Sequence, residues 1–297
     1  MHFCLMFGTQ FNLHRLISLL HFCTSLIKKY DSMTSSSSFR TMPLFIALLV
    51  ATPSFSATSF DDPLTNMNDQ LWWLADGWSN GFPFINRWES EAISFSTNGM
   101  AITLSNTPDS TDPQNLTFQS GELRSNDFYS YGCFEAEIKP AAADGVITSF
   151  FLFAGPYDRT ETSNGKHNEI DIEFLGNNTD LLQINYWTND DNYTSDHARI
   201  IFLDFDASED FHRYGIKWTK HAIQWFIDGK LVFKVKNTSS DPIPKSTDSP
   251  LRIMANIWAT DSEISGWAGE FDQNSVPITA EYRNIRYIKG GRCNLKG

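Results

Sequence analysis

Three acidic residues occupy every second position in the stretch HNEIDIEFLG (residues 167–176): Glu169, Asp171 and Glu173. Apolar residues alternate with them. If this stretch is a β-strand, its period of two places the three carboxylates on one face and the apolar side chains on the other. Like charges in a row repel one another, so the pattern needs an explanation in chemistry or in solvation.

Glycoside hydrolysis uses two carboxyl groups that flank the scissile bond, one ionised and one protonated. A third acid between them would help hold the two pKa values apart, because clustered carboxylates cannot all ionise easily. Residues i and i+4 of a strand are about 13 Å apart, whereas retaining enzymes need carboxyl groups about 5–5.5 Å apart. Glu169 and Glu173 would therefore have to lean toward each other across Asp171.

Two other interpretations fit the acidic row alone. A solvated face of a half-exposed strand shows the same alternation and needs no catalytic role. Carboxylates at i and i+2 also suit Ca²⁺ or Mn²⁺ in some β-sandwich lectins, although no companion cluster of His and Asp stands out in the sequence. The spacing by itself does not choose among the three.

The rest of the chain predicts the strands that would position this row. Asn98-Gly99 and Asp228-Gly229 each separate two alternating runs, which is a strong hairpin signal. Further strand-like runs are YGCFEAEIKP, GVITSFFLFAGP, DLLQINYWTN, PLRIMANIW and AEYRNIRYIK. No long helical pattern, repeat or interdomain linker is evident. The predicted fold class is all-β, an antiparallel β-sandwich.

The composition and net charge of the chain limit the kinds of ligand that it can bind. The chain of 297 residues has 41% hydrophobic residues, and its 14% aromatic content suits a large β core or a sugar-binding surface. The net charge is −12, and 19 basic residues oppose 34 acidic ones beyond position 57. Such a surface repels nucleic acid and anionic membrane. We expect a neutral ligand and an extracellular location.

The N-terminal region reads as a targeting segment. Arg40 precedes a short apolar run, which is followed by Pro53 and small residues. Cleavage after Ser56 or Ala57 would fit a secretory signal peptide, and the run is too short to span a bilayer as a mature helix. The alternative is an N-terminal membrane anchor that remains in the mature protein.

These features predict two regions. Residues 1–57 form the signal or targeting region, with Met33 or Met42 as alternative starts, and residues 58–297 form one β-sandwich domain. Of the four cysteines, Cys133 and Cys293 lie beyond the signal. The sequence leaves open whether these two cysteines form a disulfide, and the spacing of the cysteines matches no metal-binding or redox motif.

The segment NEIDIEFLG resembles the signature E-I-D-x-E-F-L-G of glycoside hydrolase family 16. One residue between Asp and the second Glu is typical of the family's lichenases (endo-β-1,3-1,4-glucanases) and of its plant xyloglucan transglycosylases. Other segments resemble lichenases in the same order: ADGWSNG, SGELRS, YGCFEAEIKPA, SFFLFAGP, FDASEDFHRYGIKW, IQWFIDGKLV and MANIWATDSEISGWAGEFD. The resemblance implies a concanavalin-like jelly roll with a concave substrate cleft. It also implies a secreted enzyme that hydrolyses β-1,3-1,4-glucan with retention of configuration.

The resemblance also implies roles for individual residues. Glu169 would be the nucleophile that forms a glycosyl-enzyme, Glu173 the general acid/base, and Asp171 the helper between them. Aromatic faces pack against the C–H faces of sugars, and polar side chains bond the hydroxyls. The implied substrate-binding residues are Trp78, Asn80, Glu122, Arg124, Ser149, Phe151, Phe153, Asn185, Trp187, Asn256, Trp258 and Trp267. Trp218 and Trp225, on hairpin strands, are expected in the core.

The chain departs from the lichenase pattern in places. His167-Asn168 stands where Trp-Asp is usual, so a sugar subsite or the linkage preference could differ. The Cys pair near the N-terminal loops is absent. Arg283 occupies a position where lichenases often carry an Asp ligand for a structural Ca²⁺, so we expect no metal and no cofactor.

Alternative functions on the same scaffold are a hydrolase or a transglycosylase for another β-glucan, xyloglucan or galactan. The chain ends soon after Ile288 without the plant-type Cys-rich extension, which disfavours a xyloglucan transglycosylase. A non-catalytic lectin is disfavoured because both Glu169 and Glu173 are present. The expected partner is a neutral β-glucan polysaccharide, with no nucleic acid and no membrane in the mature form, and the expected state is a monomer.

Overall fold

The computed structural model describes residues 57–107, 116–190 and 197–293. The predicted targeting segment therefore lies, up to residue 56, outside the described residues. Among the helices that the model describes, none is long and apolar enough to cross a bilayer.

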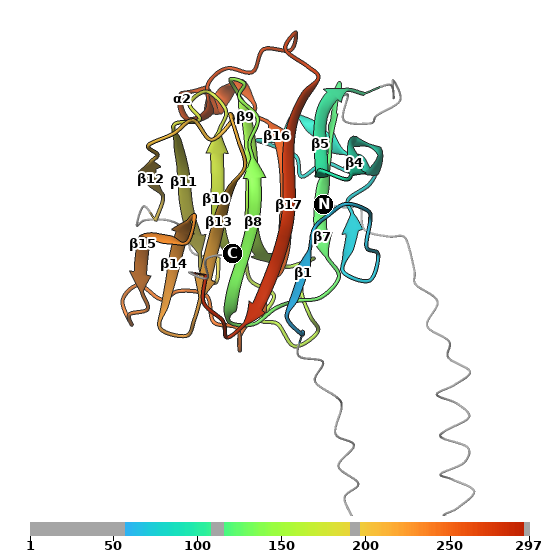
Figure 1. Cartoon of the computed structure of the whole chain (residues 1–297). Coiled ribbons are helices and arrows are strands. Elements are labelled where there is room, and N and C mark those ends of the chain that lie inside the picture. Colours follow the sequence, from blue (N-terminus) through green and yellow to red (C-terminus); the bar gives the residue numbers. More distant parts are fainter. Residues whose placement is uncertain (1–56, 108–115, 191–196, 294–297) are drawn as a thin grey trace, which may run out of the picture. The chain divides into compact units, whose positions relative to one another are not determined.

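Strands dominate the described residues and form two sheets that lie face to face (Figure 1). The larger sheet has the order β15-β14-β13-β8-β17-β5-β6-β3, with β1 beside β17 and β4 beside β5. Its strands are β1 (Phe60–Asp62), β3 (Asn86–Trp88), β4 (Ile93–Ser96), β5 (Gly99–Asn106), β6 (Phe118–Ser120), β8 (Gly132–Lys139), β13 (His212–Trp218), β14 (Ala222–Ile227), β15 (Lys230–Lys236) and β17 (Ile278–Lys289).

The smaller sheet has the order β12-β11-β10-β9-β16-β7-β2. Its strands are β2 (Trp72–Leu74), β7 (Glu122–Ser125), β9 (Val146–Ala154), β10 (Asn168–Leu175), β11 (Leu181–Trp187), β12 (Arg199–Phe202) and β16 (Arg252–Ala259). Short helical turns are η1 (Ser90–Ala92), η2 (Ser262–Ile264) and α2 (Ser265–Ala268). Of the strand pairs described, only β3 with β6 is parallel. The predicted all-β, antiparallel sandwich is confirmed.

Both predicted hairpins are present. Strands β4 and β5 are joined beside Gly99, whose φ of +120° is open to glycine but strained for other residues. A Cβ there would also lie 2.5 Å from the carbonyl oxygen of Tyr282. Strands β14 and β15 are joined at Asp228 and Gly229, with φ of 48° and 74°, as a two-residue hairpin turn requires.

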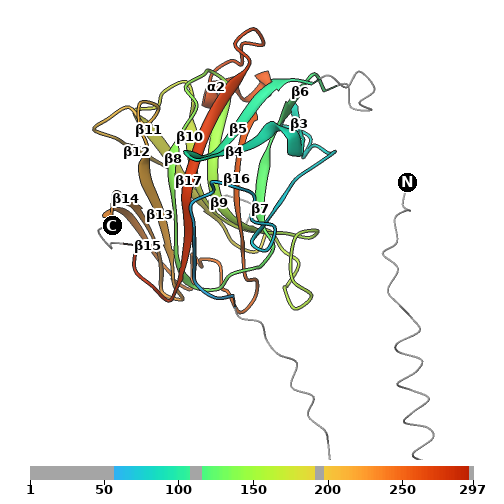
Figure 2. The same cartoon turned by 45° about the vertical axis from the view of Figure 1, so that its right-hand side comes forward.

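The hydrophobic core lies between the two sheets. Figure 2 shows the two sheets from the side of β5. Trp218 and Trp225 are fully buried, as predicted. The indole N–H of Trp225 donates to the main-chain oxygen of Asp171 on β10, at 3.0 Å. The hydroxyl of Tyr282 lies within hydrogen-bonding distance of the carbonyl oxygens of Ser149 and Asn256. Side chains of the larger sheet thereby fix the backbone of the three central strands of the smaller one.

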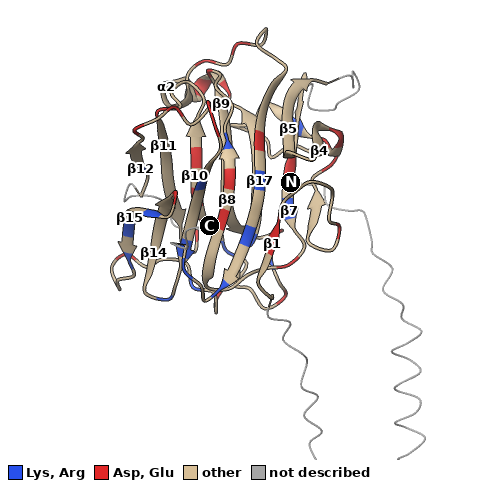
Figure 3. Cartoon of the chain, in the orientation of Figure 1, with Lys and Arg blue, Asp and Glu red and all other residues tan. Residues whose placement is uncertain are grey.

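Charged residues mark the other face of the larger sheet, where acidic positions on β8 lie beside basic positions on β17 (Figure 3). Arg286 bonds Glu135 at 2.6 Å, and Arg283 bonds Glu137 at 2.7 Å. Arg283, at the position where the resemblance to lichenases led us to expect no metal, is thus part of an ion pair.

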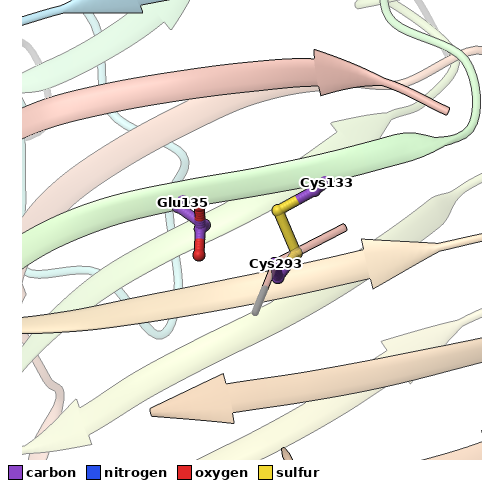
Figure 4. Close-up of side chains that lie close together, drawn as sticks. All are labelled: Cys133, Glu135 and Cys293. Carbon is purple, nitrogen blue, oxygen red and sulfur yellow. A yellow bond between two sulfur atoms is a disulfide. The ribbon is translucent and has the colours of Figure 1, made fainter. Parts of the chain in front are cut away.

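A disulfide joins β8 to the C-terminal segment. Cys133 and Cys293 are bonded, with their Cα atoms 5.4 Å apart, and Glu135 lies next to them (Figure 4). The pairing that the sequence left open is therefore present. Because both sulfur atoms are used in the disulfide, neither offers a thiolate to a metal.

Candidate active site

Strand β10 presents the acidic row away from the larger sheet. Its apolar residues alternate into the core, so the pleat turns Glu169, Asp171 and Glu173 to the opposite face. Across β9 and β11, Glu169 lies opposite Phe153 and Trp187. The predicted strand geometry of the row is therefore present.

The electrostatics of the row differ from residue to residue. Burial raises the pKa of Asp171 well above its ordinary value, and the neighbouring Glu169 and Glu173 raise it further. Burial, followed by the charge of Glu169, raises the pKa of Glu173 to about 7. Gln183 on β11 donates from Nε2 to Glu173 at 3.0 Å, and this bond lowers the pKa. Glu173 can therefore hold a proton up to neutral pH and release it there.

The carboxylate of Glu169 has a different partner. Nε2 of His167 lies 2.6 Å from Oε2 of Glu169. Glu169 is also within hydrogen-bonding reach of the Asp171 carboxyl group, and it borders a cleft on this face of the sheet. The raised pKa of Asp171 favours its protonated form, which would donate a hydrogen bond to Glu169.

A cleft of about 700 Å³ lies beside the row on the outer face of the smaller sheet. Eight of the residues expected at the site line it: Trp78, Asn80, Glu122, Arg124, Phe151, Phe153, Glu169 and Asn256. They come from β7, β9, β10, β16 and the segment between β2 and β3. The structure thus brings together residues that are up to 178 positions apart in the chain.

Hydrogen bonds hold the polar side chains of this cleft in place. Glu122 is buried, which raises its pKa, and its carboxylate accepts from Nε of Arg124 and Nδ2 of Asn256, both at 2.7 Å. Arg124 also bonds Asp158 and lies over the rings of Trp73 and Trp78. Charges that neutralise one another beside aromatic faces suit an uncharged, hydroxyl-rich ligand.

Four other expected residues lie on the cleft side of β9, on β11 or in α2. Ser149 is opposite Glu173 on β9, and Asn185 is opposite Asp171 on β11. Trp187 lies opposite Glu169, and Trp267 donates from its indole to Oε1 of Gln183 at 3.0 Å. These residues therefore flank the row on both sides, Ser149 on β9 and the other three on the β11 side.

Trp258, which was also expected at the site, is not among the residues that line this cleft. Its side chain is only 5% exposed, because it is covered by Phe84, at 4.2 Å between ring centroids, and by Trp267. Trp258 therefore supports the wall of the site from beneath. Phe84, which sequence reasoning did not select, faces the cleft in its place.

Several further residues of the site were missed. Gln183 shares a face of β11 with Asn185 and Trp187, and Arg252 shares a face of β16 with Asn256, so extending the period of two would have found both. No such signal existed for Asp158, which lies in the loop after β9 and bonds both Arg124 and Arg252. Trp73, Gly155, Pro156, Tyr157 and Met254 complete the missed lining residues.

Comparison with known proteins gives a consistent result. The family model of glycosyl hydrolases family 16 matches residues 82–279. A beta-glucanase of Bacillus subtilis is 37% identical over 251 residues, which are 83% of this chain and 94% of the relative. A lichenase structure from a mouse hindgut metagenome has a TM-score of 0.68 at 33% identity and covers 78% of this chain and 99% of its own. The Bacillus licheniformis beta-glucanase structure has a TM-score of 0.66 at 36% identity, with the same coverage.

Proposed function

Because the chain belongs to glycosyl hydrolase family 16 and is a glycoside hydrolase, we propose that it is a secreted endo-β-glucanase that cuts β-1,3-1,4-glucan with retention of configuration. The observation that carries the proposal is the row of Glu169, Asp171 and Glu173 at the edge of the cleft, with the pKa of Glu173 raised to about 7. The beta-glucanase and lichenase relatives support the choice of substrate.

The first chemical step forms a glycosyl-enzyme. A carboxylate oxygen of Glu169 attacks the anomeric carbon while the bond to the leaving sugar breaks, and Glu173 gives its proton to the leaving oxygen. Asp171 is buried between the two, and its raised pKa favours a protonated side chain, which would donate to Glu169 and keep a third negative charge out of the row. Glu173 is ionised after this step.

The second step releases the sugar. Water attacks the anomeric carbon from the opposite face, Glu173 takes a proton from that water, and the ester bond to Glu169 breaks. Two inversions at one carbon give net retention. Glu173 can serve in both steps because its pKa of about 7 lets it gain or lose a proton near neutral pH.

Secretion and the domain boundary belong to the same proposal. The Cys133–Cys293 disulfide is expected in an oxidising compartment, and the segment ending near Ala57 has the pattern of a signal peptide. Residues 58–297 would then be the mature catalytic domain. N-terminal sequencing of protein from the culture medium should find a start just after Ser56 or Ala57.

Reducing-sugar release from lichenan, laminarin, xyloglucan and agarose tests the substrate. We expect rapid release from lichenan and loss of this release in Glu169→Gln, which keeps the shape of the side chain but is no nucleophile. Equal release by the variant and the wild type would overturn the role of Glu169. Preferential cutting of another polymer would replace the proposed substrate, and binding without cutting would favour a lectin.

A further inference from the structure

His167 is the residue before β10, and its ring lies on the same face as the acidic row. Its main-chain N–H donates to Oδ1 of Asp190 at 2.7 Å, and its main-chain oxygen accepts from the N–H of Asp190 at 3.0 Å. Two bonds in opposite directions therefore fix the backbone of His167 relative to the chain that follows β11.

The imidazole ring is held as well. It stacks on Trp187, with 5.0 Å between centroids and 18° between planes, and it lies 5.4 Å from the ring of Phe153. These two aromatic residues are the cross-strand neighbours of Glu169 on either side. The ring is thus placed by the same pair of strands that flank Glu169, and its side chain is 31% exposed.

The orientation of the ring determines what it can do. Nε2 lies 2.6 Å from Oε2 of Glu169. An ionised carboxylate only accepts hydrogen bonds. Nε2 must therefore be a protonated ring nitrogen, and its N–H donates the hydrogen bond to Oε2 of Glu169. Hydrogen bonds to ionised groups are stronger than those between neutral groups, and this one restrains Oε2 of the Glu169 carboxylate.

We propose that His167 is a positioning residue for the nucleophile: the hydrogen bond from its Nε2 fixes Oε2 of Glu169 and aims the second oxygen at the anomeric carbon. This proposal rests on the proposed function of Glu169. When the glycosyl-enzyme forms, the attacking oxygen becomes the ester oxygen and Oε2 becomes the carbonyl oxygen. The donor stays on Oε2 throughout and stabilises the carboxylate again as the ester breaks.

Two variants separate the hydrogen bond from the stacking. His167→Phe keeps a ring against Trp187 but has no donor, whereas His167→Gln keeps an N–H donor near the position of Nε2 and loses the ring. With lichenan, we expect kcat of His167→Phe to fall by about tenfold to a hundredfold with KM changed by less than about threefold. His167→Gln should recover most of the lost kcat.

His221→Phe is the matched control, because His221 is exposed in the turn between β13 and β14 on the larger sheet. It should keep the kcat of the wild type. Thermal unfolding of all three variants shows whether a fall in kcat reflects folding instead. An unchanged kcat in His167→Phe would overturn the proposal, and so would equal losses in the Phe and Gln variants, because the donor that His167→Gln keeps would then restore nothing.

A crystal structure of His167→Phe gives a readout that does not depend on activity. We expect the Glu169 carboxylate to rotate away from the position it holds beside Nε2, and to return in His167→Gln. If Glu169 stays in place in His167→Phe, the positioning role is wrong even where lichenan is cut. If the wild type cuts no β-glucan but Glu169 does move, the proposed function fails and the positioning of Glu169 stands.

Discussion

Two contacts set the properties of the acidic row at the scale of single residues. Glu169 is bonded by His167 at one end of the row, and Glu173 accepts from Gln183 at the other. Asp171 lies between them, buried and with its pKa raised well above the ordinary value. Identical side-chain chemistry thus gives different protonation behaviour, because each carboxyl group has a different environment.

The contact from Gln183 predicts a change in pH dependence. Glu173 must be protonated to act as the acid, so kcat/KM should fall as the pH rises through about 7. The bond from Gln183 favours the ionised form, so its loss in Gln183→Leu raises the pKa of Glu173. The alkaline limb of the pH profile should then move to higher pH.

Trp267→Phe is the control for this measurement. It removes the indole N–H that bonds Gln183 but leaves the contact between Gln183 and Glu173. The alkaline limb should keep its position in this variant even if KM changes. A limb that stays in place, or moves to lower pH, in Gln183→Leu would contradict the assignment of Glu173 as the acid.

At the scale of elements, the larger sheet supports the site although none of its described strands lines the cleft. The indole of Trp225 on β14 crosses the core and donates to the main-chain oxygen of Asp171. The indole of Trp218 on β13 makes an equivalent bond to the main-chain oxygen of Pro244, in the loop before β16. The two contacts have the same chemistry but only the first fixes β10.

This pair of tryptophans predicts a separation of stability from activity. Trp225→Phe and Trp218→Phe should each lower the free energy of unfolding by about 1–3 kcal/mol, because each leaves a buried carbonyl without its donor. Only Trp225→Phe should also lower kcat, since only Trp225 holds the backbone of Asp171. Urea unfolding and lichenan kinetics measure the two effects. Equal kcat in both variants would show that the backbone of β10 does not need this anchor.

The elements themselves could be predicted from the sequence to a large extent. The alternation of acidic and apolar residues in β10 and the turn residues of the two hairpins are local signals, and both agree with the structure. The short helix α2 was not predicted, because four residues are too few for a helical period. Its Trp267 nevertheless reaches Gln183.

At the scale of the whole molecule, the site depends on strand order, which the sequence pattern alone does not determine. Strand β16 lies between β9 and β7, so Asn256 meets Glu122 although the two are far apart in the chain. The resemblance of several segments, in the same order along the chain, to lichenases predicted that these residues lie together in one site. It did not predict the bond from His167 to Glu169, because a histidine there departs from the family pattern, nor the burial of Trp258 beneath Phe84.

The central claim is that Glu169 is the nucleophile and Glu173 the acid/base, and azide rescue tests it most directly. The substrate is an aryl β-glucan oligosaccharide with a good leaving group. In Glu169→Ala, azide should attack from the vacated side and give the α-glycosyl azide. In Glu173→Ala, the glycosyl-enzyme still forms, and azide should give the β-glycosyl azide. Reversed products, or the same anomer from both variants, would contradict the account.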